Sequence, residues 1–175
     1  PWKRLGGRGT YIQLYGTEGL WGMYVVEVPP GGALNIEHHV YEKIVLVVEG
    51  RGSTEVWQEA NPKKQHFEWQ KGSLFAIPLN AKHRHFNGSG SERALLASTT
   101  DLPLVMNTFH NEKFVFENNF DFSERTGKES HYTGEGELIT VKPGNHMWET
   151  NFVPDLAAIE LKTWGDRGAG GTNIM

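Results

Sequence analysis

The stretch from Gly72 to Asn87 reads GSLFAIPLNAKHRHFN, and its spacing decides the fold. Pro78 follows the glycine by six positions, His83 follows the proline by five, and Asn87 follows the histidine by four. Asn80 stands in the middle, where short polar side chains tolerate the left-handed backbone that glycine otherwise supplies. We therefore predict a tight turn at Asn80 between two short strands.

Short apolar segments separated by glycine and proline surround this stretch, which is typical of an all-β chain. Gly50–Gly52 is interpreted as one of the turns between them. No predicted strand is long enough to be stable alone, so we expect an antiparallel barrel over about residues 10–100. The predicted strands are Tyr11–Tyr15, Gly22–Val28, Ile44–Glu49, Ser53–Gln58, His66–Trp69, Ser73–Pro78, His83–Phe86 and Arg93–Thr99.

The strand pattern weakens after about residue 101. Pro103–Phe116 fits one helix or a strand with a turn, Phe120–Gly136 fits a loop, and Leu138–Val141 fits a short strand. We divide the chain into a β-barrel with N-terminal strands over residues 1–120 and a C-terminal extension over residues 121–175. The glycine-rich tail from Gly165 to Met175 is typical of a linker.

Composition limits the partners and the chemistry. The chain has 175 residues, a net charge of -4 and no cysteine, so disulfides and thiolate metal sites are excluded. Any metal ligand must therefore be histidine, aspartate or glutamate. No apolar run approaches the roughly 20 residues of a membrane span, and the scattered basic residues argue against nucleic acid. We expect no membrane partner, a small-molecule ligand and a cytoplasmic location.

A second stretch, Gly32 to Gly50, reads GALNIEHHVYEKIVLVVEG. Together with residues 72–87 it resembles the two sequence motifs of the cupin superfamily, and the resemblance implies an all-β jelly-roll barrel with a polar interior. The first cupin motif has His-x-His, three or four residues, Glu, six residues and Gly. In this chain Glu37 stands at the first of those histidines, His39 at the second, and Lys43 at the glutamate.

The segments Phe67–Pro78 and His83–Asn87 also resemble bicupins, in which two cupin domains share one chain. Gentisate-type ring-cleaving dioxygenases are one such group. The resemblance implies a second cupin domain after residue 175, and it implies metal-dependent oxygen chemistry less directly, because cupins carry many chemistries.

Alternation along a strand places Glu37 and His39 on one face, and likewise His83 and His85. Two histidines and a carboxylate with open positions form the ligand set of non-haem Fe(II) oxygenases. We predict that Glu37, His39 and His83 bind a divalent metal, with Fe(II) favoured and Mn, Ni or Zn as alternatives. The residues expected beside the metal or the substrate are His85, Glu42, Lys43 and Asn87.

Lys43 separates two hypotheses. If it points inward, its ammonium pairs with Glu37 and replaces the metal, and the barrel is a non-catalytic binding or structural domain with no cofactor. If it points outward, Glu42 can reach inward, and the barrel is a metal-dependent oxygenase of a small organic or aromatic acid, or a related lyase or isomerase.

Three further expectations concern surfaces. Both faces of Ile44–Val48 are apolar, so one face fills the barrel and the other is expected to form a homodimer interface. His38 neighbours His39 and should face the opposite side of the chain. His131 has no partner at a ligand spacing and is expected at the surface.

Overall fold

The computed structural model describes residues 2–61, 63–142 and 145–159. The predicted linker from Gly165 to Met175 lies outside these residues. The barrel strands are β1 (Gly9–Ile12), β2 (Gly22–Val28), β3 (Lys43–Glu49), β4 (Arg51–Trp57), β5 (Gln65–Gln70), β6 (Leu74–Ile77), β7 (Lys82–Asn87) and β8 (Ala94–Thr100). The following elements are the helices α1 (Leu102–Phe109) and α2 (Glu112–Phe116), the 3-10 turns η1 (Ser123–Arg125), η2 (Glu129–Tyr132) and η3 (Leu156–Ala158), and the strands β9 (Glu137–Lys142), β10 (Asn145–Glu149) and β11 (Phe152–Val153).

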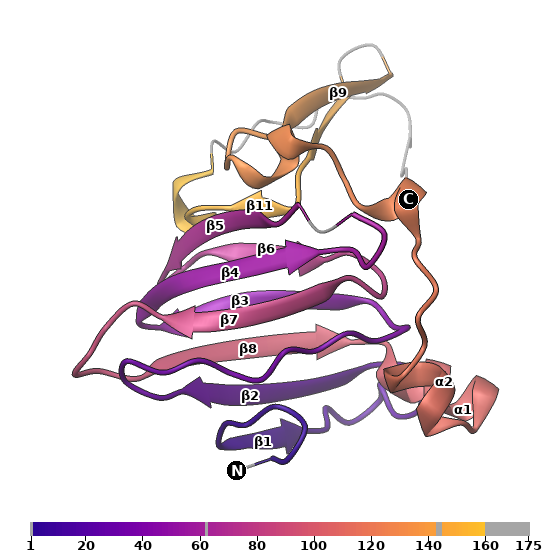
Figure 1. Cartoon of the computed structure of the whole chain (residues 1–175). Coiled ribbons are helices and arrows are strands. Elements are labelled where there is room, and N and C mark those ends of the chain that lie inside the picture. The colour runs from indigo at the N-terminus through magenta and orange to yellow at the C-terminus, as the bar shows by residue number, and fades with distance from the viewer. Residues whose placement is uncertain (1, 62, 143–144, 160–175) are drawn as a thin grey trace.

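Two sheets face each other and enclose the barrel interior. One sheet has the strand order β1-β2-β8-β3-β6-β11, and the other has the order β5-β4-β7. In Figure 1 the three-stranded sheet lies in front, with β3 and β6 visible behind it. Neighbouring strands within both sheets are antiparallel. The predicted antiparallel β-barrel is therefore confirmed.

Three of the differences between the observed elements and the prediction have a clear structural reason or affect a barrel strand. β1 begins at Gly9, two residues before the predicted strand. The turn predicted over Gly50–Gly52 is made by Gly50 alone, with a φ of 87°, and β4 begins immediately after it. Gly52 belongs to the sheet, where it pairs with Trp69 and Asn87, and a Cβ there would strike the Trp69 ring and the Phe86 carbonyl. Residues 103–116 form two helices because His110 takes a φ of 47° and ends α1.

The segment after residue 120 packs against one end of the barrel. β11 extends the large sheet by pairing with β6. Phe152 lies with its ring centroid 4.8 Å from that of Phe67, which in turn lies 5.1 Å from Phe75. Tyr132 of η2 joins the same buried cluster. These aromatic contacts fill the space between the sheets and fix the C-terminal segment on the barrel.

Asn80 ties the central turn to the segment that follows α2. Its φ of 57° confirms the predicted left-handed turn. Its side-chain amide donates to the carbonyls of Asn118 and Phe120 at 2.8 and 2.9 Å. Its side-chain oxygen lies 3.2 Å from Nδ1 of His38, which is half-buried rather than fully turned to solvent. Asparagine therefore does what glycine does at this turn and also anchors a distant loop.

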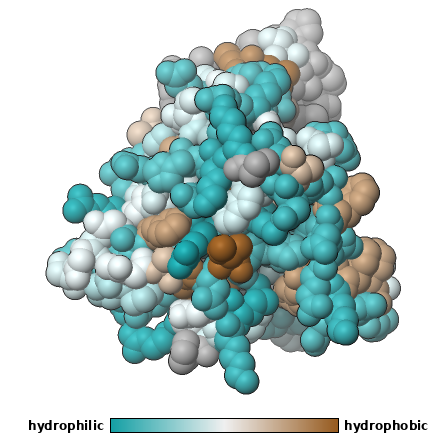
Figure 2. Space-filling view, viewed as in Figure 1, coloured by the Kyte–Doolittle hydropathy of each residue, from teal (hydrophilic) through white to brown (hydrophobic). Residues whose placement is uncertain are grey.

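The outer face of β3 is apolar and open to solvent. Ile44, Leu46 and Val48 are exposed, whereas the alternating Val45 and Val47 fill the core. Figure 2 shows the opposite side of the molecule, over β5, β4 and β7, to be mainly hydrophilic, with brown atoms gathered where Figure 1 places α1 and α2. Among the described residues, no helix is long and apolar enough to cross a membrane.

We predict that Asn80→Gly lowers the free energy of unfolding by about 1–3 kcal/mol, because the turn survives but two partly buried hydrogen bonds, to the carbonyls of Asn118 and Phe120, are lost. Asn80→Ala should cost about 1–2 kcal/mol more, because alanine is strained in a left-handed turn. Urea denaturation of the three proteins measures both differences. Equal stability of the wild type and Asn80→Gly would show that the anchoring hydrogen bonds contribute nothing.

We also predict that the protein self-associates through the exposed row of β3. Replacing Leu46 by Glu should shift a dimer to a monomer, because a charge in the centre of an apolar interface is desolvated without a partner. Light scattering at micromolar concentration gives the mass, and Glu68→Gln, an exposed change on the other sheet, is the control. A monomeric wild type would refute this prediction.

Candidate functional site

The candidate site is a row of buried polar side chains inside the barrel. Glu37 forms an isolated antiparallel bridge with His83, and their backbones exchange hydrogen bonds of 3.0 and 2.9 Å. Lys43 begins β3, and His83 and His85 are alternate inward residues of β7. Together with His39 these side chains are at most 4% exposed. The strands thus bring together the residues that the two sequence motifs contain.

Lys43 points into the barrel. Its Nζ lies 3.3 Å from Oε2 of Glu37 and 3.1 Å from Nε2 of His83. Burial alone would lower the pKa of Lys43, but the Glu37 carboxylate and the Tyr24 hydroxyl outweigh it, and the pKa is raised. The side chain therefore stays an ammonium ion. This inward orientation is the one expected under the hypothesis of a non-catalytic barrel without a metal.

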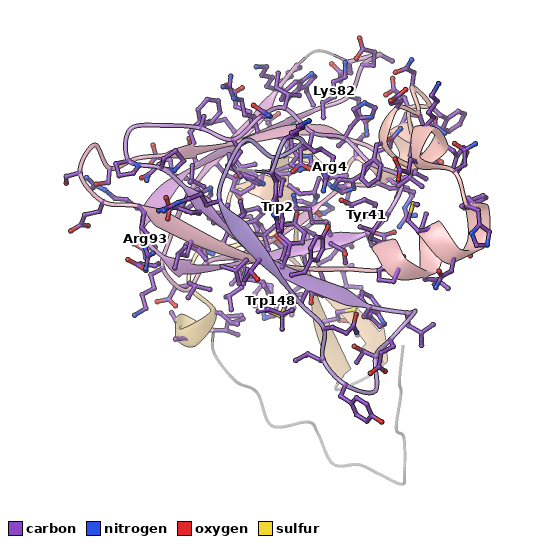
Figure 3. All side chains as sticks on the ribbon, turned by 90° about the horizontal axis from the view of Figure 1, so that it is seen from below. Trp2, Arg4, Tyr41, Lys82, Arg93 and Trp148 are labelled. Atoms are coloured by element: carbon purple, nitrogen blue, oxygen red, sulfur yellow. The ribbon has the colours of Figure 1, made fainter. Side chains whose placement is uncertain are left out.

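Arg4 supplies the second partner of the buried carboxylate. Its Nη1 contacts Oε1 of Glu37, so each carboxylate oxygen faces a cation. The guanidinium carbon also lies 4.7 Å from the centroid of the Phe116 ring. Figure 3 shows Arg4 and Tyr41 together near the middle of the molecule, whereas Lys82 and Arg93 lie at its edge. The sequence analysis missed Arg4, because no motif links it to a residue 33 positions away.

Backbone carbonyls fix the tautomers of two histidines. Nδ1 of His83 donates to the carbonyl of Ala81 at 3.1 Å, which leaves its Nε2 lone pair to accept from Lys43. Nδ1 of His39 donates to the carbonyl of Tyr41 at 3.1 Å, and the two rings stack with centroids 3.7 Å apart. Within the described residues, Nε2 of His39 has no hydrogen-bond partner. His39 therefore keeps a buried, unused lone pair.

His85 belongs to a separate hydrogen-bonded chain on the β4 side. Trp69 donates its indole N–H to Oγ1 of Thr54 at 2.9 Å, and that oxygen lies 2.8 Å from Nδ1 of His85. The Thr54 hydroxyl oxygen and Nδ1 of His85 therefore share a hydrogen bond, whereas Nε2 of His85 has no partner among the described residues. Burial, followed by the charge of Lys43, holds the pKa of His85 well below its usual range.

The metal ligands predicted from the sequence lie close together but do not fit a divalent ion as arranged. The rings of His39 and His83 are nearly perpendicular, with centroids 5.3 Å apart. The Lys43 ammonium, however, forms hydrogen bonds with both Nε2 of His83 and Oε2 of Glu37. A divalent ion bound to the same two atoms would be repelled by that ammonium unless the Lys43 side chain moved away. The metal set stays a prediction that solution binding must test.

Two other predicted residues point elsewhere. Glu42 faces outward, and its carboxylate lies 2.6 Å from Nη2 of Arg125. Asn87 donates its amide to the carbonyls of Val28, Pro29 and Glu92, and its oxygen accepts from the Ser89 N–H. In this geometry Asn87 fixes the turn after β7 and offers no free group to the barrel interior.

His131, expected at the surface, is instead buried beside the β9–β10 hairpin. Ligand atoms of His131, Glu137 and Glu149 lie within 4.8 Å of one another. The Lys128 backbone N–H donates to Nδ1 of His131, so Nε2 holds the proton of the neutral ring. The Lys128 ammonium already lies 2.8 Å from the Glu137 carboxylate. These contacts engage Nδ1 of His131 and the Glu137 carboxylate, and the three residues still form a cluster of metal-ligating side chains outside the barrel interior.

Comparison with solved structures identifies the fold. The chain is similar to vicilin from Capsicum annuum, with 17% identity, a TM-score of 0.50, and coverage of 56% of this chain and 28% of that one. It is similar to Peruvianin-I, a cysteine peptidase from Thevetia peruviana latex, with 16% identity, a TM-score of 0.50, and coverage of 58% and 64%. Oxalate decarboxylase from Lactobacillus farciminis has 21% identity, a TM-score of 0.49, and coverage of 55% and 29%.

At these identities the likeness concerns the fold alone, and the chain spans less than a third of the vicilin. None of the curated proteins matches this sequence significantly. A family model described as Cupin matches residues 17–125, which is more than half of the chain. Those residues include both sequence motifs and the barrel strands β2 to β8, and only β1 of the eight barrel strands lies outside them. The chain therefore belongs to the cupin family.

Proposed function

We propose that this cupin is a metal-independent barrel that binds a small molecule or supports a neighbouring domain. The observation that supports the proposal is the position of Lys43, whose ammonium bonds both Glu37 and His83 inside the barrel. Arg4 holds the remaining oxygen of the same carboxylate. In this proposal an internal network of charges and hydrogen bonds replaces the divalent ion for which the family's ligand positions are suited.

The charges of the network favour this arrangement. Burial and neighbouring positive charge hold the pKa values of His39, His83 and His85 well below the usual range, so the rings are neutral. Two cations then face one carboxylate, Glu37, in a region with little water. Adding a divalent ion would increase the repulsion, whereas removing one partner of a buried pair typically costs about 3–5 kcal/mol. The ammonium is therefore held firmly.

A second candidate is the metal-dependent enzyme that the gentisate-type resemblance suggests, an oxygenase of a small organic or aromatic acid. The buried Nε2 of His39, which lacks a partner among the described residues, favours it. Glu37, His39 and His83 would hold the ion, with Fe(II) first and Mn, Ni or Zn as alternatives. The ion would supply a Lewis-acidic centre with open positions. This function requires the Lys43 ammonium to leave its two partners.

Metal binding distinguishes the two candidates. We predict that the wild type shows no tight binding of Fe(II), Mn(II), Ni(II) or Zn(II) in calorimetric titration. Lys43→Glu should raise the affinity by orders of magnitude, because it exchanges a repelling charge for a ligand. Lys43→Met is the matched control, since it removes the charge without adding a ligand, and it should gain much less affinity.

Tight binding by the wild type, with little gain in Lys43→Glu, would overturn the metal-independent proposal. If the wild type binds none of the four ions and Lys43→Glu binds them, the oxygenase is excluded. Elemental analysis of the protein as purified provides an independent measurement.

Acid should destabilise the barrel. The three buried histidines have folded pKa values well below the value of about 6.5 expected in the unfolded chain. The unfolded state therefore binds more protons as the pH falls below about 6.5, and the folded state loses stability. Each histidine contributes up to about 1.4 kcal/mol per pH unit below pH 6.5 and little above it, so each loses about 1.4 kcal/mol between pH 7.5 and 5.5 and the three together about 4 kcal/mol.

Urea denaturation in the presence of a chelator measures this loss. His85→Asn should reduce it by about one third, because one of three groups no longer titrates. His66→Gln, a change at an exposed histidine, should leave it unchanged. A free energy of unfolding that stays constant between these pH values would contradict the neutral state of the interior histidines.

A further inference from the structure

Three metal-ligating side chains meet where η2 packs against the β9–β10 hairpin, outside the barrel (Figure 1). His131 belongs to η2, Glu137 begins β9, and Glu149 ends β10. One ligand atom of each residue lies within 4.8 Å of the ligand atoms of the other two. A ring nitrogen and two carboxylates therefore converge on one point.

Strand pairing places the two carboxylates side by side. Glu137 and Glu149 are directly opposite partners in the antiparallel hairpin, so their side chains leave the same face. Two like charges in such a pair repel each other and destabilise the hairpin. Glu149 is exposed, and among the described residues its carboxylate has no hydrogen bond or salt bridge, although its charge acts on Lys128. A cation bound between the two carboxylates would remove this repulsion.

Lys128 provides a weakly held cation at this place. Its Nζ lies 2.8 Å from Oε2 of Glu137, and the Ser130 hydroxyl donates to Oε1 at 3.0 Å. These two contacts lower the pKa of Glu137, so the carboxylate is ionised at neutral pH. The Lys128 side chain is 66% exposed, and exposed ion pairs of this kind contribute little to stability. A divalent ion can therefore displace the ammonium at small cost.

His131 adds a buried nitrogen that lacks a partner. The residue is 5% exposed, and its backbone carbonyl accepts from the Asn151 N–H and the Thr150 hydroxyl, which fixes it beside the end of β10. Nδ1 accepts from the Lys128 backbone N–H, whereas Nε2 has no hydrogen-bond partner among the described residues. A buried ring N–H without an acceptor is costly, and a metal bond to Nε2 would remove that cost.

An ion reaches this nitrogen from the side of the exposed glutamate. Nε2 itself is covered, so the Glu149 carboxylate binds the ion first and moves with it toward the ring. The ligand atoms lie within 4.8 Å of one another, and ligands about 2.1 Å from one zinc ion lie at most about 4.2 Å apart, so a small movement of Glu149 completes the set.

Binding at Nε2 also moves one proton within the ring. The neutral ring carries its proton on Nε2, and with an ion at that atom the proton lies on Nδ1, so the charge of the ring does not change. The ring then loses the hydrogen bond from the Lys128 N–H, which is long at 3.2 Å and therefore weak.

We propose that His131, Glu137 and Glu149 bind one zinc-like divalent ion, with water at the remaining position. One imidazole and two carboxylates suit Zn²⁺, whereas Mg²⁺ and Ca²⁺ prefer ligand sets of oxygen alone. The ion takes the place of the Lys128 ammonium and joins η2 to the hairpin, so it stabilises the C-terminal segment. With three protein ligands and a competing ammonium, the dissociation constant should be roughly 10–100 µM, weaker than in structural zinc sites with four ligands.

This site is separate from the buried charge network of the barrel. None of Glu37, His39, Lys43 and His83 belongs to it. The inference does not rest on the metal-independent function of the barrel, and either could fail without the other. Moderate binding that depends on Glu149 belongs to the hairpin, whereas the barrel test concerns tight binding that responds to Lys43.

Calorimetric titration of the untagged protein with zinc chloride tests the proposal. Glu149→Gln should weaken binding by about tenfold or more, because a ligand is lost from an exposed position where the fold tolerates the change. Glu135→Gln is the matched control, since it removes the same charge from an exposed position two residues before Glu137, and binding should stay within about twofold. Lys128→Gln should tighten binding by about threefold or more, because the competing ammonium is gone.

NMR of the labelled wild type gives a second measurement that needs no variant of the buried histidine. Zinc should move the His131 ring proton from Nε2 to Nδ1 and shift the Lys128 amide resonance. Zinc should also raise the Tm of the wild type but not that of Glu149→Gln. The proposal is overturned if the wild type binds no zinc, if Glu149→Gln binds it like the wild type, if Lys128→Gln binds it no more tightly, or if saturating zinc leaves the His131 proton on Nε2.

Discussion

The buried carboxylate of Glu37 is the constraint on which the barrel interior depends. Burying a charge is costly unless it is paired, and each oxygen of this side chain, which is 2% exposed, faces a cation, Arg4 on one side and Lys43 on the other. Those contacts connect the N-terminal segment, β3 and the bridge to β7. The ammonium in turn donates to the nitrogen of His83 that the Ala81 carbonyl leaves free, and its charge helps to keep the histidines neutral.

The sequence contained enough information for the barrel and for part of this network. The spacing from Gly72 to Asn87 predicted the turn at Asn80, and alternation along the strands predicted which residues of β3 and β7 share a face, while the direction of Lys43 stayed open. The departure from the family motif also indicated Lys43 as the decisive residue. Such features are local, because a few consecutive residues of a strand or turn determine them.

Arg4, Gln58 and His131 could not be predicted in the same way. Arg4 reaches Glu37 only after the N-terminal segment has folded over the end of the barrel, and no periodic pattern encodes that contact. The strand pattern gives the inward orientation of Gln58 but not the missing partner of its amide. His131 is buried by a 3-10 turn and a hairpin outside the regular strands. The positions of Arg4 and His131 depend on contacts between segments far apart in sequence, which single-sequence reasoning does not reach.

The position of β3 has a consequence for how the chain folds. Its hydrogen-bonded neighbours are β6 and β8, which both come later in the sequence, and Lys43 pairs across the sheet with Thr100. During synthesis one edge of β3 must therefore wait for β6 and the other for β8, the last of the eight barrel strands, to leave the ribosome. Folds dominated by such distant pairings cross their barrier in roughly milliseconds to seconds. In that interval the apolar residues of β3 are the part of the nascent chain most exposed to aggregation and to chaperones.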